Sequence, residues 1–139
     1  MKTDLIEITD KVISPEQVIN RARTSGSGCV ATYVGLIRDN SHGKKVASVE
    51  YQDKTGKATA GLHKIAAETK EKWAVENIAF THRVGKLNVG DINLVIAVAA
   101  GHRGEAFAAC QYIIDRFKES LPTHKIETYQ DGSTLDGGA

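Results

Sequence analysis

The most apolar stretch of the chain, residues 91–100, limits the possible folds more than any other feature. It ends in seven consecutive residues without a polar side chain, Leu94–Ala100. A bilayer span needs about 20 such residues, so this segment is not a transmembrane helix. A short run of this kind, rich in valine and isoleucine, is typical of a strand with both faces buried. We therefore expect residues 91–100 to form a central strand that is covered on both sides.

Helix and strand patterns alternate along the rest of the chain. Ser14 and Pro15 predict a helix start, because serine caps free N–H groups and proline fits the first helical position. Further helices are expected over residues 57–73 and from His102 to just before Pro122. The remaining apolar patterns predict strands over residues 5–8, 29–37, 46–52, 76–84 and 125–129. This order favours an α+β fold with a largely antiparallel sheet and about three helices.

The connections between these elements are also predicted. The strands over residues 29–37 and 46–52 are expected to pair as a hairpin with a long polar loop, and residues 85–90 to be a turn-rich link. A chain of 139 residues suits one domain, which we assign to residues 1–130. The glycine-rich remainder, residues 131–139, is expected to be a flexible tail.

Composition and charge exclude several classes of protein. The chain has 18 Lys and Arg residues against 17 Asp and Glu residues, a balance that argues against a general nucleic-acid or membrane-surface binder. Acidic residues near the N-terminus stand where a signal peptide needs apolar ones, so a cytoplasmic protein is expected. Cys29 and Cys110 lie far apart in apolar surroundings and are expected to be buried thiols.

The chain carries no standard catalytic or metal-binding signature. It has no nucleophile-elbow serine motif, no phosphate-binding P-loop and no zinc-protease helix motif. The histidines are dispersed, and none has the spacing of a metal ligand set; they are His42, His63, His82, His102 and His124. We therefore expect no metal site, and a structural role for His82 is the favoured interpretation.

Cationic side chains stand at the junctions between predicted elements. These residues are Arg38, His102, Arg103, Lys118 and Lys125. Junctions of this kind display functional groups on a rigid scaffold, and the helix that begins near His102 offers free N–H groups to an anion. Crowding of the cations would also lower the pKa of a lysine among them and make it a better base or nucleophile. The simpler alternatives are that Lys118 only suits the helix dipole and that Arg38 is a solvated strand end. The pattern alone predicts an anion-binding α+β domain.

Several segments, taken together and in order, resemble the large, catalytic subunit of molybdopterin synthase. The resemblance covers roughly residues 28–128. The segments that carry it are Gly35–Asn40, Val49–Tyr51, Thr81–Asp91, Gly101–Phe107, Phe117–Lys118 and Pro122–Glu127. They include the patterns HR-x-G-x-L-x-x-G-D and HR-x-x-A-F, followed by a pair of lysines around a proline.

This resemblance implies an α/β-hammerhead fold and a homodimer of large subunits. Each subunit binds a small ubiquitin-like sulfur carrier with a C-terminal Gly-Gly thiocarboxylate, which gives a heterotetramer. Two sulfur transfers then convert the phosphate-bearing cyclic pyranopterin monophosphate into the molybdopterin dithiolene. No cofactor is implied, because the carrier supplies the sulfur. His124 stands where the family usually has a tryptophan.

The resemblance also implies the site residues. Lys118 matches the family's key catalytic lysine, and Lys125 and Arg103 are expected to stabilise phosphate and developing negative charge. The substrate-binding positions implied by the match are Leu36, Ile37, Arg38, His102, Arg103, Lys118, Lys125, Ile126 and Glu127.

Helix geometry predicts that this site is shared between two subunits. His102 and Lys118 lie at opposite ends of one predicted helix, about 24 Å apart at 1.5 Å per residue. Both cannot contact one small substrate. We therefore expect Arg38, Lys118 and Lys125 from one subunit to face His102 and Arg103 from its dimer mate.

Two other functions remain open at this point. The chain is compatible with a non-catalytic paralogue that binds a carrier tail or an anionic ligand without turnover. A nucleic-acid binder that uses residues 38–45 is the least favoured, and it predicts steep salt dependence of oligonucleotide binding.

Overall fold

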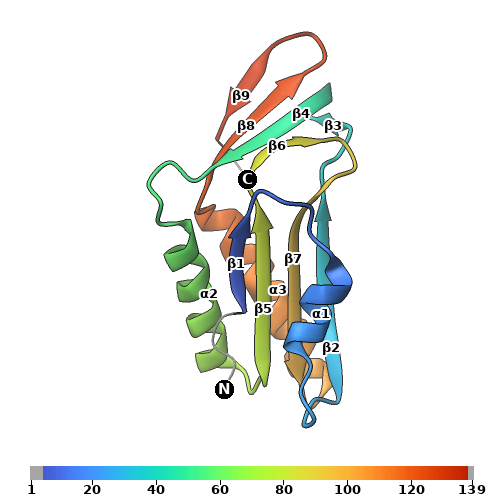
Figure 1. Ribbon diagram of the computed structural model, residues 1–139, viewed down its shortest axis with the longest axis vertical. Helices are drawn as coiled ribbons and strands as arrows, with labels where there is room; N and C mark the ends of the chain where they lie inside the picture. Colours follow the sequence, from blue (N-terminus) through green and yellow to red (C-terminus); the bar gives the residue numbers. More distant parts are fainter. Residues whose placement is uncertain (1–4, 138–139) are drawn as a thin grey trace.

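The computed structural model describes residues 5–137. Its larger part is a four-stranded sheet in the order β1-β5-β7-β2, in which only the β1–β5 pair is parallel. Helix α1 covers one face of this sheet, and helices α2 and α3 cover the other (Figure 1). The bounds are β1 Ile6–Thr9, α1 Pro15–Ala22, β2 Cys29–Leu36, α2 Ala58–Lys72, β5 Asn77–Arg83, β7 Ile92–Ala100 and α3 Arg103–Ser120.

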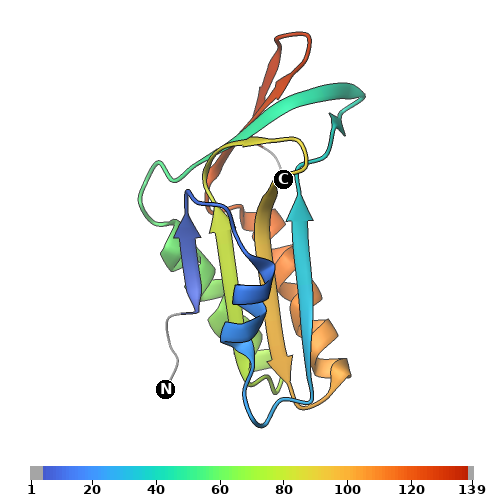
Figure 2. The same cartoon turned by 45° about the vertical axis from the view of Figure 1, so that its right-hand side comes forward.

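A second, smaller sheet sits at one end of the first (Figures 1 and 2). Its strands pair in the order β3-β4-β8-β9, and β6 also pairs with β4. All of these pairs are antiparallel. Their bounds are β3 Asn40–Ser41, β4 Lys44–Gln52, β6 Gly85–Asn88, β8 His124–Tyr129 and β9 Thr134–Asp136.

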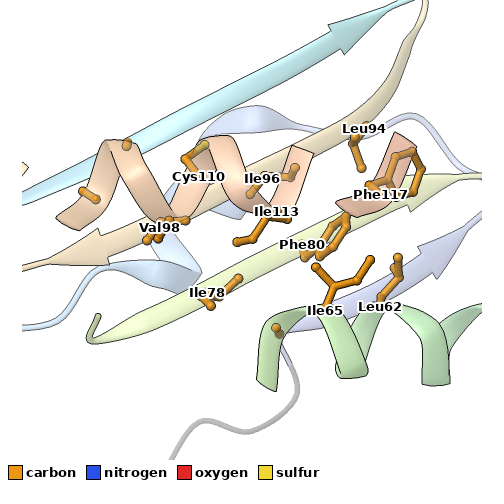
Figure 3. Close-up of a cluster of buried hydrophobic side chains, with 14 of the residues drawn as sticks. Leu62, Ile65, Ile78, Phe80, Leu94, Ile96, Val98, Cys110, Ile113 and Phe117 are labelled. Atoms are coloured by element: carbon orange, nitrogen blue, oxygen red, sulfur yellow. The ribbon is translucent and has the colours of Figure 1, made fainter. Parts of the chain in front are cut away.

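Strand β7 is the centre of the larger sheet, as its apolar sequence predicts. Every residue from Leu94 to Ala100 is buried. Alternate side chains, among them Ile96 and Val98, pack with α2 and α3, as Figure 3 shows. The intervening side chains, such as Val95, pack with α1. Full burial of one such side chain contributes about 1.5–3 kcal/mol, so this strand anchors both cores.

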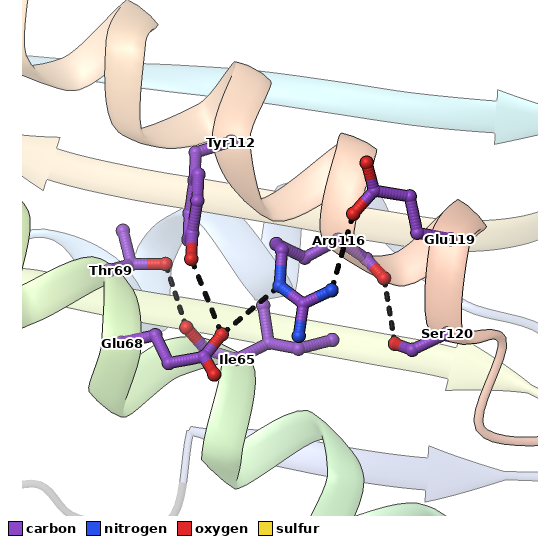
Figure 4. Close-up of polar contacts among 7 residues, drawn as sticks. All are labelled: Ile65, Glu68, Thr69, Tyr112, Arg116, Glu119 and Ser120. Atoms are coloured by element: carbon purple, nitrogen blue, oxygen red, sulfur yellow. Dashed lines mark hydrogen bonds and ion pairs between the residues drawn. The ribbon is translucent and has the colours of Figure 1, made fainter.

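The helices begin where their sequences predict. Ser14 Oγ accepts a hydrogen bond from the Gln17 N–H at 3.3 Å, and Pro15 occupies the first turn of α1. Helices α2 and α3 are joined by a polar cluster (Figure 4), in which the Glu68 carboxylate accepts hydrogen bonds from Tyr112 and Arg116 at 3.3 and 3.2 Å. This cluster braces the C-terminal half of α3 against α2.

The predicted hairpin between residues 29–37 and 46–52 is wrong. Strand β2 pairs with β7, whereas β4 pairs with β6 and β8 in the second sheet. The chain crosses between the sheets after Ile37, and the tight turn comes later, at His42 and Gly43. Both of these residues have positive φ (54° and 76°), which is typical of a two-residue hairpin loop.

Three short strands form where the sequence predicts none, and the first of them is β3, which lies in the predicted polar loop and pairs with β4. Part of the predicted link at residues 85–90 is β6, which adds an edge to β4. The sequence predicts a flexible tail over residues 131–139, but residues 134–136 form β9 against β8. Asp131 shapes the turn before β9 by accepting hydrogen bonds from the Ser133 N–H and hydroxyl. Residues 138–139 lie outside the described residues.

Gly28 stands where two backbone segments come very close. A Cβ atom at this position would lie 2.2 Å from the carbonyl oxygen of Gly101, just before α3 begins. We expect Gly28→Ala to lower the free energy of unfolding by about 1–3 kcal/mol, because the backbone must shift. Urea denaturation measures the effect. Gly104→Ala is the control, because its Cβ would enter open space and alanine favours a helix; equal stability of the two variants would contradict the prediction.

Candidate active site

A cavity of about 140 Å³ opens where the two sheets meet. Its walls come from the end of β2, the following loop, β4, the start of β7, the end of α3 and β8. Six of the nine predicted site residues line it: Leu36, Ile37, Arg38, Lys118, Lys125 and Glu127. These residues are separated by up to 91 positions in the sequence (127 − 36), and the fold brings them together.

Three cations converge on this cavity. Lys118 lies in the last turn of α3, Lys125 lies on β8 opposite Tyr51, and Arg38 follows β2. Partial burial lowers the pKa of the Lys118 ammonium, and the charges of Lys125 and Arg38 lower it further. Lys118 is therefore closer to its neutral, nucleophilic form than an ordinary lysine. A bound anion would relieve the repulsion among the three groups.

Glu127 organises the Lys125 side of the cavity. Its Oε1 atom accepts hydrogen bonds from the Tyr129 hydroxyl at 2.6 Å and from the Ser41 hydroxyl at 3.0 Å. Its Oε2 atom lies 3.5 Å from Lys125 Nζ. Burial alone would raise the pKa of Glu127, but these hydrogen bonds and the Lys125 charge outweigh burial and hold the pKa below 4.5. Glu127 therefore stays charged and fixes Lys125.

The hydrogen bond from Tyr129 to Glu127 leads to a prediction about the stability of the fold. We expect Tyr129→Phe to lower the free energy of unfolding by about 1.5–3 kcal/mol, because a buried carboxylate loses a donor. The hydrogen bond favours the charged form of Glu127. The difference in stability between wild type and Tyr129→Phe is therefore complete above pH 4.5, the ordinary pKa of this carboxyl. It shrinks as the pH falls through the lowered pKa that Glu127 has in the folded state. Urea titrations at several pH values measure it. A constant difference down to low pH would contradict this assignment.

Three predicted residues do not line the cavity. Ile126 lies between Lys125 and Glu127 on β8, so its side chain points to the opposite face of the strand. His102 and Arg103 are exposed at the N-terminal end of α3, whereas Phe117 and Lys118 in the cavity wall lie in the last turn of that helix. Arg103 and Lys118 are about 22 Å apart along the 1.5 Å rise of the helix.

Some residues of the cavity are not found by reasoning from sequence. They are Tyr33, Asn40, Ser41, Val46, Val49, Tyr51, Asn93, Phe117 and Leu121. Ser41 is 86 positions from its partner Glu127, and no local pattern marks such a contact. The alternation of Val49 and Tyr51 on β4 marks them as buried but does not say which cavity they reach.

A second, more open hollow adjoins the first at the two lysines. Lys118, Leu121 and Lys125 line both hollows, and Thr123, His124 and Gly137 complete the second. Within residues 5–137, no group of histidine, cysteine or acidic side chains is arranged to hold a metal ion. None of the described helices is long and apolar enough to cross a membrane.

Comparison with known proteins decides the family. The model of the MoaE protein family matches residues 8–120. The chain belongs to the MoaE family. A molybdopterin synthase catalytic subunit from Nostoc is 39% identical, over 94% of this chain and 80% of the relative. The corresponding subunit from Bacillus subtilis is 36% identical, over 94% and 83%.

A solved structure supports the same assignment. The crystal structure of molybdopterin synthase from Staphylococcus aureus is 32% identical and has a TM-score of 0.89, covering 99% of this chain and 100% of that one. The predicted α+β fold of the molybdopterin synthase large subunit, with three helices and largely antiparallel sheets, is thereby confirmed. This member of the MoaE family is an enzyme of molybdenum cofactor biosynthesis.

Proposed function

We propose that this enzyme transfers two sulfur atoms to cyclic pyranopterin monophosphate, which forms the dithiolene of molybdopterin. Each of two thiocarboxylated small carrier proteins supplies one sulfur and leaves with an ordinary C-terminal carboxylate. The observation that carries the proposal is the convergence of Arg38, Lys118 and Lys125 on one cavity. The names of the relatives support the same reaction. A phosphate-bearing substrate needs such a cluster, because guanidinium and ammonium groups bind phosphate through charge-assisted hydrogen bonds.

The three cations have different tasks in this reaction. Arg38 and Lys125 bind the phosphate and stabilise negative charge that develops during transfer. Lys118, with its lowered pKa, acts as acid and base, or holds the acyl carbon at the end of the carrier tail. The reaction needs no metal or cysteine nucleophile, because the carrier brings the sulfur. Burial raises the pKa of Cys110 to about 11, which makes this thiol a poor nucleophile.

The carrier tail and the pterin need separate access to Lys118. The cavity between the sheets and the more open hollow beside it share Lys118, Leu121 and Lys125 in their walls. A narrow Gly-Gly tail fits the approach to Lys118 from one side, while the phosphate of the pterin is bound from the other. Tail and substrate would then meet at the Lys118 amine.

A second copy of the chain is proposed to complete the site. The cavity of about 140 Å³ is small for a ligand pocket, which typically measures about 300 Å³ or more, and His102 and Arg103 lie far from it. The outer edge of β2 has no strand partner among the described residues (Figure 2). This free edge offers a place for the partner subunit.

Pairing of two β2 edges about a two-fold axis would bring the separated residues together. Antiparallel pairing sets Cys29 of one subunit near Leu36 of the other. The Cys29 end of β2 lies beside Ala100, two residues before His102, and the Leu36 end leads to Arg38. The exposed Val34 and Leu36 would be covered at the same time. The partner's α3 would thus begin beside the cavity.

The test is turnover with defined components. We expect the purified enzyme to form molybdopterin from cyclic pyranopterin monophosphate and thiocarboxylated carrier, and to form none with a carrier that ends in an ordinary carboxylate. Product is measured by mass spectrometry, and carrier binding by calorimetry. Carrier binding without product formation would contradict the proposal and favour the non-catalytic paralogue.

A further inference from the structure

A buried histidine outside the cavity contacts the immediate neighbours of both lysines. His82 on β5 has no exposed surface. Its Nδ1 atom lies 2.9 Å from the backbone oxygen of Asn93, and its Nε2 atom lies 2.9 Å from the hydroxyl of Thr123. A carbonyl oxygen only accepts, so Nδ1 carries the proton and donates it. Burial lowers the pKa of His82, so the ring is neutral and Nε2 accepts from the Thr123 hydroxyl.

Thr123 belongs to the short connection between the two lysines. It lies two residues before Lys125, is buried, and follows the end of α3 at Ser120. Leu121, at the start of this connection, has φ 2° and ψ 99°, which is not a regular helix ending. Among the described residues, positions 121–123 make no backbone hydrogen bond of the turn or loop kind. The Thr123 side chain is therefore the main polar anchor of this connection.

His82 also makes two aromatic contacts, each with a residue that lies next to one of the two lysines. The His82 ring lies edge-on to Phe117, with 5.0 Å between ring centroids, and Phe117 directly precedes Lys118. The His82 ring also lies edge-on to Tyr51, with 4.9 Å between ring centroids, and Tyr51 is the cross-strand partner of Lys125. His82 thus contacts α3, the connection and β4 at once.

We propose that His82 is a positioning residue that, through Thr123 and Phe117, sets the separation between the Lys118 and Lys125 side chains. Phe117 fixes where α3 ends, and Thr123 fixes where β8 begins. Loss of the His82–Thr123 hydrogen bond frees the connection and lets Lys125 move relative to Lys118. The catalytic consequence of this movement rests on the proposed sulfur transfer, but the movement itself does not.

Thr123→Val tests the proposal, because valine keeps the shape of threonine and removes its hydroxyl. We expect a fall in kcat of about tenfold to a hundredfold, since small misplacements of reacting groups have effects of this size. Binding of inorganic pyrophosphate, measured by calorimetry, should weaken several-fold. Thr123→Ser keeps the hydroxyl and is expected to stay within about twofold of the wild type.

A readout that does not depend on turnover separates this proposal from the proposed function. Lysines are labelled by ¹³C-methylation, and the Lys118 signal is assigned by its absence in Lys118→Ala. We expect the Lys118 amine to titrate at higher pH in Thr123→Val than in the wild type, because Lys125 has moved away. If Thr123→Val does not fold, His82→Gln is used, since its amide reaches the Nε2 position and should preserve the wild-type titration, whereas His82→Asn should not.

The outcomes are distinct. A shifted titration in Thr123→Val with an inactive wild-type enzyme would support the positioning role and overturn the sulfur transfer. The second outcome is an active wild-type enzyme and a Thr123→Val variant with the same kcat, pyrophosphate affinity and Lys118 titration. This outcome would overturn the positioning role alone. The same unchanged titration in both His82→Gln and His82→Asn would also overturn it.

Discussion

Lys118→Ala is expected to lower the rate of product formation by about 10³-fold or more, while the protein stays folded and binds its carrier. The reason is that Lys118 combines access to the cavity with a lowered pKa, which burial and the neighbouring Lys125 and Arg38 produce. A positioned acid or base of this kind contributes about 10²–10⁴-fold to a rate. Single-turnover formation of molybdopterin from cyclic pyranopterin monophosphate measures the loss.

A matched control separates catalysis from the helix dipole. Lys70 lies in the last turn of α2 as Lys118 lies in the last turn of α3, and Lys70 is exposed. If Lys118 only served the dipole, Lys70→Ala and Lys118→Ala would have the same small effects on stability and none on activity. We expect Lys70→Ala to keep wild-type activity. Near-normal turnover by Lys118→Ala would remove Lys118 from the mechanism.

The same substitution should not destabilise the fold. The pKa of Lys118 is lowered in the folded state, so folding disfavours the protonated ammonium. The unfolded state binds more protons between the lowered value and the ordinary 10.5, and the wild type therefore gains stability as the pH rises through that window. Below it, Lys118→Ala should be at least as stable as the wild type in thermal unfolding. An unfolding temperature of Lys118→Ala at or above that of the wild type would show that Lys118 does not serve the stability of the fold.

The local elements are predictable from sequence because their determinants are local. The apolar run at Leu94–Ala100 specifies a strand buried on both faces, and Ser14 with Pro15 specifies the start of α1. Strand partners are not local. Residues 29–37 and 46–52 look like a hairpin, but β2 pairs along its whole length with β7, and β4 pairs with β6 and β8. The short strands β6 and β9 exist only because β4 and β8 offer edges to them.

In the candidate site, too, some features are visible in the sequence and others arise only in the folded structure. Arg38, Lys118 and Lys125 stand out because cations at element ends are visible in a sequence, and the cavity joins all three. The hydrogen bonds that hold Glu127 beside Lys125 are not visible, since Ser41 on β3 and Glu127 on β8 meet only when the second sheet forms. His82 is the clearest case. A structural role is the favoured reading of its sequence context, and only the contacts with Thr123 and Phe117 connect it to the lysines.

The proposal that two subunits share the site leads to a prediction that a site within one subunit would not make. Arg103→Ala and Lys118→Ala are each expected to be nearly inactive as homodimers. A dimer with one copy of each would have one cavity with the wild-type Lys118 of its own subunit and the partner's wild-type Arg103. We therefore expect heterodimers, co-expressed with two different tags and purified on both, to recover about half of the wild-type activity.

The control for this experiment uses two substitutions on the same side of the site. In a heterodimer of Lys118→Ala and Lys125→Ala, each cavity keeps one damaged lysine, because both lysines line the cavity of their own subunit. No recovery is expected there. If only the heterodimer of Arg103→Ala and Lys118→Ala recovers activity, the N-terminal end of one subunit's α3 lies at the cavity of the other subunit. Absence of recovery in both pairs would mean that Arg103 acts within its own chain or not at all. Because Arg103 and Lys118 are about 22 Å apart along α3, Arg103 could then not contact the substrate that Lys118 holds.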